Sequence, residues 1–170
     1  MIGTASHSSE GETISTRLRG LVVGQGSQAP RARLLGCYTG RIIGPDEREA
    51  KRAAGGGGIQ DAYSFPINGT HAMDPTEPDG SLPPHTPHGM ALVNEPRGDT
   101  MPNVWPMEYS FGGCRDQHGR PGVPYYAARD ILAGEELTVC YGPHYDRSRY
   151  TEHTTCADGA LLSRWSALQD

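Results

Sequence analysis

Lysine is almost absent from this chain of 170 residues: Lys51 stands alone among 15 basic side chains, and the others are arginine. Basic residues are also outnumbered, because 20 Asp and Glu give a formal net charge of −5. A nucleic-acid binder that works through a basic face needs clustered Lys and Arg to neutralise phosphates, so the composition argues against that class. The charge is compatible with a basic peptide as partner, although it is also an ordinary solubility charge.

Long apolar runs and paired cysteine motifs are missing as well. No apolar stretch approaches the length of a membrane-spanning helix, and residues 1–16 are small and polar, unlike a signal peptide. The four cysteines (Cys37, Cys114, Cys140 and Cys156) lie far apart and form no C-x-x-C pair. These absences predict a soluble intracellular protein with reduced thiols and no membrane partner.

Glycine and proline are abundant, with 23 and 14 residues, and they separate many short apolar runs. Runs that read as strands cover residues 18–23, 34–43, 62–67, 123–130 and 137–141. Residues 45–54 place acids before bases, the charge order of a short helix, and residues 161–168 predict a second helix. The sequence therefore predicts one loop-rich, mainly β domain behind a flexible N-terminal arm over residues 1–16.

The most informative segment is AARDILAGEELTVCYG, from Ala127 to Gly142. It predicts a strand, a tight turn on Gly134, two acids, and a strand that ends at the hydroxyl of Tyr141 before a glycine. The pattern A-x-R-D-I-x-A-G-E-E-L-T-x-x-Y-G resembles the C-terminal signature of SET-domain methyltransferases. Seen alone, Tyr141 is read as a packing residue, and the length of the match is what favours a functional role.

Three further segments resemble the same family in the same order along the chain. LLGCYTGRII (34–43) is similar to the family strand with an aromatic-then-glycine pattern. AYSFPI followed by Met73-Asp74 resembles the middle of the domain, and HGMALVNEP followed by Met101-Pro102-Asn103 resembles its G-N-x-A-R-F-I-N-H-S-x-x-P-N segment. The resemblance covers residues 17–142 as a SET domain, with 143–170 as a post-SET-like segment that contains a short helix. It implies several small sheets of short strands, knot-like C-terminal threading and few short helices.

The resemblance implies transfer of a methyl group from S-adenosylmethionine to a lysine side chain of a protein substrate, with histone tails as the family-level expectation. Free lysine is mostly ammonium at neutral pH, so such a site desolvates the amine and aligns it with the methyl group. Tyr141 stands at the position of the family's catalytic tyrosine. The positions that match the lysine channel, or fill it nearby, are Tyr38, Trp105, Tyr109 and Val139. A small residue at Val139 implies a roomier pocket unless one of the nearby aromatics fills it.

The cofactor-binding residues implied by the resemblance are Arg19, Gly20, Leu21, Asn94, Glu95, Tyr141, Gly142 and Trp165. Gly24-Gln25-Gly26 is a competing assignment for the opening glycine motif. Taken from the residues alone, Trp165 is read first as a residue that docks an amphipathic helix, as helical aromatics usually do. Glu95 replaces the family's histidine, and its charge is expected to alter cofactor binding without abolishing it, since the family uses that pair largely through backbone contacts.

Cysteine and histidine raise one further possibility. Cys140, His144, His153 and Cys156 are zinc ligands by type, but their spacing fits no strong pattern, and we predict no metal site. Two other functional readings stay open. Glu95 and the weak glycine motif are compatible with a catalytically inactive SET-like module that binds other proteins, and a β-rich structural protein is the remaining alternative.

Overall fold

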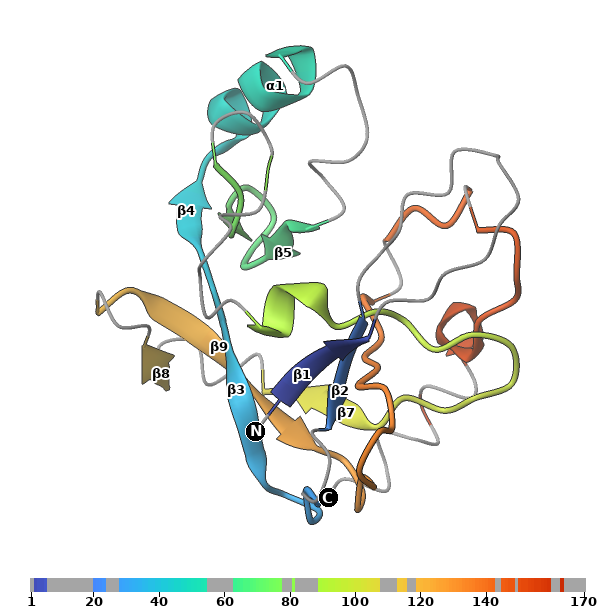
Figure 1. The fold of residues 1–170 in the computed structure, drawn as a ribbon. Coiled ribbons are helices and arrows are strands. Elements are labelled where there is room, and N and C mark those ends of the chain that lie inside the picture. The colour runs from blue at the N-terminus through green and yellow to red at the C-terminus, as the bar shows by residue number, and fades with distance from the viewer. Residues whose placement is uncertain are drawn as a thin grey trace. The chain divides into compact units, whose positions relative to one another are not determined.

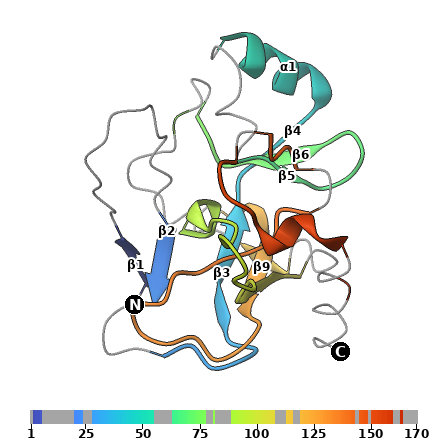
Figure 2. The ribbon, with the colours of Figure 1, turned by 90° about the vertical axis from the view of Figure 1, so that its right-hand side faces the viewer.

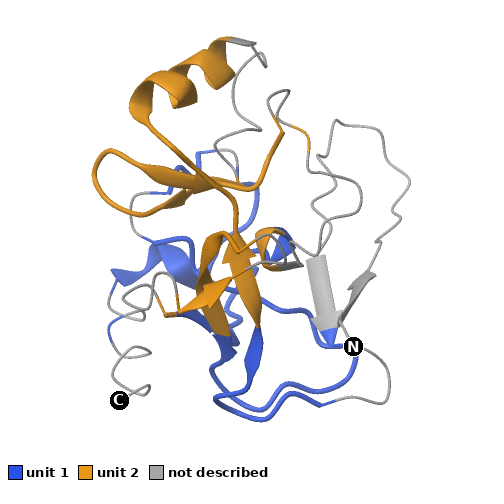
Figure 3. Cartoon of the chain, turned by 90° about the vertical axis from the view of Figure 1, so that its left-hand side faces the viewer, with its two compact units in different colours: residues 1–35, 92–106, 126–170 blue, residues 36–91, 107–125 orange. Residues whose placement is uncertain are grey.

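The computed structural model describes residues 2–5, 20–23, 28–54, 63–77, 81, 89–107, 113–115, 119–142, 145–148, 150–159 and 163. The chain divides into two compact units, coloured separately in Figure 3. Unit 1 comprises residues 1–35, 92–106 and 126–170, and unit 2 comprises residues 36–91 and 107–125. Each unit is therefore built from segments that are distant in sequence.

Short strands dominate the described residues (Figure 1). The strands are β1 (Ile2–Ala5), β2 (Gly20–Val23), β3 (Leu34–Thr39), β4 (Arg41–Ile43), β5 (Phe65–Pro66), β6 (Ala72–Asp74), β7 (Val104–Pro106), β8 (Cys114–Arg115) and β9 (Pro121–Ala127). Helical structure comprises α1 (Pro45–Ala54) and the short 3-10 helices η2 (Gly89–Leu92) and η4 (Thr155–Ala157). The sheets are β1-β2, β4-β6-β5 and β3-β9-β7 with β8 on β9. The prediction of a mainly β chain with few helices is confirmed.

In unit 1, β1 pairs antiparallel with β2, with Ile2 opposite Val23. Residues 2–5, which belong to the flexible arm predicted over residues 1–16, pair here as a strand. The end of β2 is tied to a tight turn, because Val23 donates to the carbonyl of Glu135 (3.1 Å) and Gly134 donates to that of Val23 (2.8 Å). Gly134 has φ +82°, the left-handed region that favours glycine, as the predicted turn requires.

In unit 2, β4, β6 and β5 lie side by side as a small antiparallel sheet (Figure 2). The helix α1 begins at Pro45 and ends at Ala54, which confirms the prediction for residues 45–54. It carries the single lysine into a buried position. Lys51 Nζ donates to Asp74 Oδ2 (2.6 Å), Thr76 Oγ1 (3.0 Å) and the Thr76 carbonyl (3.3 Å), so its three N–H groups have partners and its charge is compensated.

All four cysteines form disulfides, and each unit contains one of the two bonds. Cys37 bonds to Cys114 in unit 2, and Cys140 bonds to Cys156 in unit 1. The prediction of reduced thiols is therefore wrong. The bonds join residues 77 and 16 positions apart, which no local cysteine motif reveals. Over the part of the chain that the structure describes, no helix has the length and apolar character needed to cross a membrane.

Gly40, the glycine of the aromatic-then-glycine pattern, lies where two backbones meet. A Cβ atom at this position would lie 2.5 Å from the carbonyl carbon and oxygen of Asp74 and 2.8 Å from the nitrogen of Pro75. Backbone atoms cannot move aside as the end of a flexible side chain can. Glycine is therefore required here by the close approach of β4 to the end of β6.

We predict that Gly40→Ala lowers the free energy of unfolding by about 2 kcal/mol or more, because the added methyl overpacks a backbone contact. Gly69→Ala is the matched control. Gly69 is exposed and an added Cβ would meet nothing within 4 Å, so a change within about 0.5 kcal/mol is expected. Urea denaturation of the two variants measures both values, and equal stability would contradict the close contact at Gly40.

Candidate functional site

The segment that precedes Tyr141 runs beside the segment that contains Asn94 and Glu95. Asn94 and Thr138 form a parallel bridge, and the N–H of Val139 donates to the carbonyl of Asn94 (2.9 Å). Buried Asn103 fixes the same segment from another direction, because it accepts from the N–H of Thr138 (2.8 Å) and donates to the carbonyl of Glu136 (2.8 Å). Two segments that the sequence selects separately therefore meet within unit 1.

Tyr141 is held at both ends by this neighbouring segment. Its hydroxyl donates to the carbonyl of Val93 at 2.8 Å, across 48 positions of sequence. Its backbone N–H donates to Oε1 of Glu95 at 2.7 Å. Since one contact fixes the backbone and the other fixes the far end of the ring, the position of the phenol is set by residues 93–95.

Glu95 forms a buried ion pair with Arg147. Its carboxylate accepts from Arg147 Nε (2.9 Å, at Oε2) and from Nη2 (2.7 Å, at Oε1), the two-pronged geometry that suits guanidinium and carboxylate. The side chain of Glu95 is 1% exposed and that of Arg147 is 14% exposed. The arginine also donates to the carbonyls of Gly142 (2.8 Å) and Tyr145 (3.1 Å). Arg147 thus connects Glu95 to the chain immediately after Tyr141.

Gly142 accepts this contact in a left-handed backbone conformation. Its φ is +90°, which side chains with a Cβ rarely adopt. A glycine after Tyr141 therefore lets the chain turn back so that Arg147 reaches Glu95. The Y-G pair in the motif has a direct structural reason.

Two further tyrosines surround the ion pair. The ring centroids of Tyr141 and Tyr145 are 4.7 Å apart, those of Tyr145 and Tyr150 are 6.1 Å apart, and the guanidinium of Arg147 lies 5.5 Å from the Tyr145 ring centroid. Burial raises the pKa of Tyr145 and of Tyr150, and the negative charge of Glu95 raises both pKa values further. Both phenols therefore stay neutral at physiological pH and act as hydrogen-bonding groups.

Most of the predicted site residues belong to unit 1. Asn94, Glu95, Val139, Tyr141 and Gly142 come together as described, with Val139 buried. The side chain of Asn94 donates to Glu136 Oε1 (3.1 Å), so its amide faces the turn. Gly20 and Leu21 lie in β2, and Trp105 lies half-buried in β7. Arg19, Tyr109 and Trp165 lie outside the described residues, as do Gly24-Gln25-Gly26 and most of the predicted helix at 161–168.

Tyr38 belongs to unit 2, where it is buried in an aromatic cluster. Its hydroxyl donates to the carbonyl of Tyr63, and its ring centroid lies 5.4 Å from that of Phe65 and 5.9 Å from that of Tyr125. Desolvation raises the pKa of Tyr38 well above its ordinary value, and the nearby Tyr125 adds to the effect. The ring packs as part of a core, and its hydroxyl has a fixed partner.

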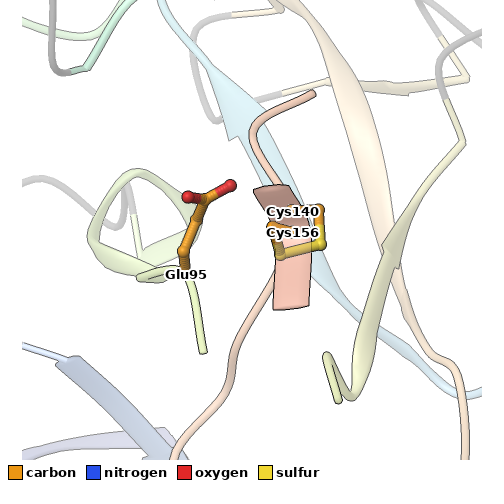
Figure 4. Close-up of side chains that lie close together, drawn as sticks. All are labelled: Glu95, Cys140 and Cys156. Atoms are coloured by element: carbon orange, nitrogen blue, oxygen red, sulfur yellow. A yellow bond between two sulfur atoms is a disulfide. The ribbon is translucent and has the colours of Figure 1, made fainter. Parts of the chain in front are cut away.

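The four residues considered as zinc ligands by type are placed only in part. Cys140 and Cys156 share a disulfide, His153 is exposed, and His144 lies outside the described residues. Glu95 is the neighbour that sequence reasoning missed, because its carboxylate oxygen and the two Sγ atoms all lie within 4.8 Å of one another (Figure 4). The absence of zinc from the purified protein stays a prediction.

Sequence reasoning also missed Arg147. A signal was available, because an acid in a segment of apolar residues calls for a compensating cation when it becomes buried. Arg147 and Arg149 are the basic residues shortly after Tyr141. Spacing alone does not choose between them.

Comparisons with known proteins add no family assignment: no protein-family model matches the sequence, and no curated protein matches it.

We predict that Arg147→Met lowers the free energy of unfolding by about 3 kcal/mol, because it leaves the Glu95 carboxylate buried without its counter-charge. Arg52→Met is the control. Arg52 pairs with Glu49 at 3.6 Å on an exposed helix face, where the loss should be about 0.5 kcal/mol or less. Thermal and urea unfolding at neutral pH measure the difference, and a similar small loss for both variants would show that the Glu95 pair is solvated.

Proposed function

We propose that this chain is a SET-type protein-lysine methyltransferase that uses S-adenosylmethionine. The observation that carries the proposal is the meeting of two separately recognised segments: the hydroxyl of Tyr141 donates to the carbonyl of Val93, and its N–H donates to Glu95. The SET-type fold with knot-like threading, and the assignment of residues 17–142 to it, are part of this proposal.

The structure supports the proposal by giving the Glu95 side chain a role of its own, which leaves the cofactor contacts of this segment to the backbone. The sequence alone leaves the charge of Glu95 unbalanced next to the cofactor segment. Arg147 compensates that charge, and both carboxylate oxygens face the guanidinium. Cofactor contacts at Asn94 and Glu95 then fall to the backbone, as the family resemblance implies, while the Glu95 side chain holds Tyr141 in place.

The proposed chemistry needs little from the protein beyond alignment and electrostatics. S-adenosylmethionine supplies an activated methyl group on a positively charged sulfur. The hydrogen bond from the Tyr141 hydroxyl to the Val93 carbonyl orients the phenol oxygen. The lone pairs of this oxygen are acceptors that suit a polarised methyl group or the target amine. Because the ring is fixed before substrate arrives, reorganisation of this group costs little during the reaction.

Lys51 gives the proposal a second, weaker support. A lysine methyltransferase that carries accessible lysines can modify itself. The only lysine here is buried, and its ammonium is bonded to Asp74 and Thr76. The proposed substrate is therefore a lysine on another protein, and a basic histone tail matches the net charge of −5.

An inactive SET-like module that binds proteins is the second candidate. Tyr38 is buried and its hydroxyl already donates to the carbonyl of Tyr63, which favours this reading. Peptide binding without cofactor binding would identify such a module.

We predict that Tyr141→Phe reduces single-turnover methylation by roughly 100-fold or more, equivalent to about 2.7 kcal/mol of lost transition-state stabilisation. The substitution keeps the ring, so affinity for the cofactor should stay within a few-fold. Tyr38→Phe should have the milder effect, or should change the number of methyl groups added. The assay uses radiolabelled S-adenosylmethionine with histones and a cell extract.

Comparing the methylation rate of Tyr141→Phe with that of the wild type is decisive once the wild type methylates a substrate. A Tyr141→Phe rate within about threefold of wild type would make Tyr141 a packing residue and would remove the register on which the catalytic assignment depends.

A further inference from the structure

The disulfide of Cys140 and Cys156 lies against a buried carboxylate from a third segment. One ligand atom from each of Glu95, Cys140 and Cys156 lies within 4.8 Å of the other two (Figure 4). Among the residues that the structure describes, this is the single group of three or more such side chains so close together. From this geometry we propose that reduction of the disulfide converts the cluster into a zinc site held by Cys140, Cys156 and Glu95.

The redox step has a simple route. Cys140 is half-buried whereas Cys156 is 1% exposed, so a thiolate from a cellular dithiol has better access to the sulfur of Cys140. Attack there breaks the S–S bond and releases the Cys156 thiolate. The second thiol of the reductant then displaces Cys140, which leaves the reductant as a disulfide and transfers two electrons to the protein.

Contacts that do not involve sulfur hold both cysteines near their positions. On the Cys156 side, Thr155 Oγ1 donates to the Thr100 carbonyl (2.8 Å), and the N–H of Gly98 donates to the His153 carbonyl (2.8 Å). On the Cys140 side, the neighbouring N–H groups of Val139 and Tyr141 bond to Asn94 and Glu95. The reduced thiols therefore remain preorganised as a pair, which lowers the entropic cost of binding an ion.

The ligand set selects the ion. Thiolates favour zinc over magnesium or calcium, which prefer oxygen ligands, and zinc accepts a carboxylate beside sulfur. Glu95 supplies an oxygen by giving up one of its hydrogen bonds, and a water can take a fourth position. Two protons leave the thiols as zinc binds.

Charge balance also favours a divalent ion. In the disulfide form, the negative charge of Glu95 is matched by Arg147. Two thiolates add two negative charges to this buried cluster, and one Zn²⁺ cancels them. Both the disulfide form and the zinc form are then electrically neutral, so binding of the ion adds no net charge to the buried cluster.

Cobalt(II) provides a direct spectroscopic test, since thiolate-to-cobalt absorption reports sulfur ligands. The chain is reduced with a dithiol, freed of reagent without air and titrated with Co²⁺. We expect thiolate charge-transfer and tetrahedral d–d absorption that saturates at about one equivalent per chain and is displaced by Zn²⁺. The disulfide form should show neither band.

Matched variants separate this cluster from the other cysteine pair. Cys156→Ser should abolish the signal, Cys114→Ser should retain it, and Glu95→Gln should weaken cobalt binding by tenfold or more, as loss of a ligand charge predicts. No absorption in a reduced chain with a native circular dichroism spectrum would overturn the proposal, and so would a signal retained by Cys156→Ser. Unfolding of the reduced chain would also overturn it, because the site requires the fold to survive loss of the bond.

The outcome does not depend on the proposed methyltransferase activity. Cobalt absorption without methyl transfer would support the metal site and reject the activity, while methyl transfer without cobalt absorption would do the opposite.

Discussion

The buried ion pair of Glu95 and Arg147 is the interaction on which the arrangement around Tyr141 depends. A carboxylate that is 1% exposed is strongly unfavourable unless its charge is matched, and the guanidinium matches it with two hydrogen bonds. Once paired, Glu95 is a fixed acceptor for the N–H of Tyr141. The ion pair therefore stabilises the turn at Gly142 and the position of the tyrosine ring together.

The Cys140–Cys156 disulfide reinforces the same region by a different principle. It closes a loop between two cysteines that are 16 positions apart, and this loop contains Gly142, Tyr145 and Arg147. In a chain-entropy model, a cross-link of this length stabilises the fold by about 3 kcal/mol, chiefly through the unfolded state. Covalent closure and charge pairing thus both act on the loop that follows Tyr141.

Local patterns predicted much of the secondary structure. Residues 45–54 form α1 because Pro and acids begin the helix and bases end it, which is information held within ten residues. Gly40 and Gly134 were predictable as special positions, since a close backbone approach or a left-handed turn selects glycine. Residues 137–141, which the sequence predicts as a strand, form a single β-bridge at Thr138. The other hydrogen bonds of this segment go to Asn103, Asn94 and Glu95 and do not extend a strand ladder.

Features that depend on long-range contacts were not predictable from spacing. The disulfides, the pairing of residues 2–5 with 20–23, and the choice of Arg147 as counter-ion are all set by tertiary structure.

The most direct test of the central claim, that the Glu95-anchored site holds S-adenosylmethionine, is calorimetry on the disulfide-bonded chain. Saturable binding near one cofactor per chain is expected. No heat and no thermal shift at millimolar cofactor would contradict it.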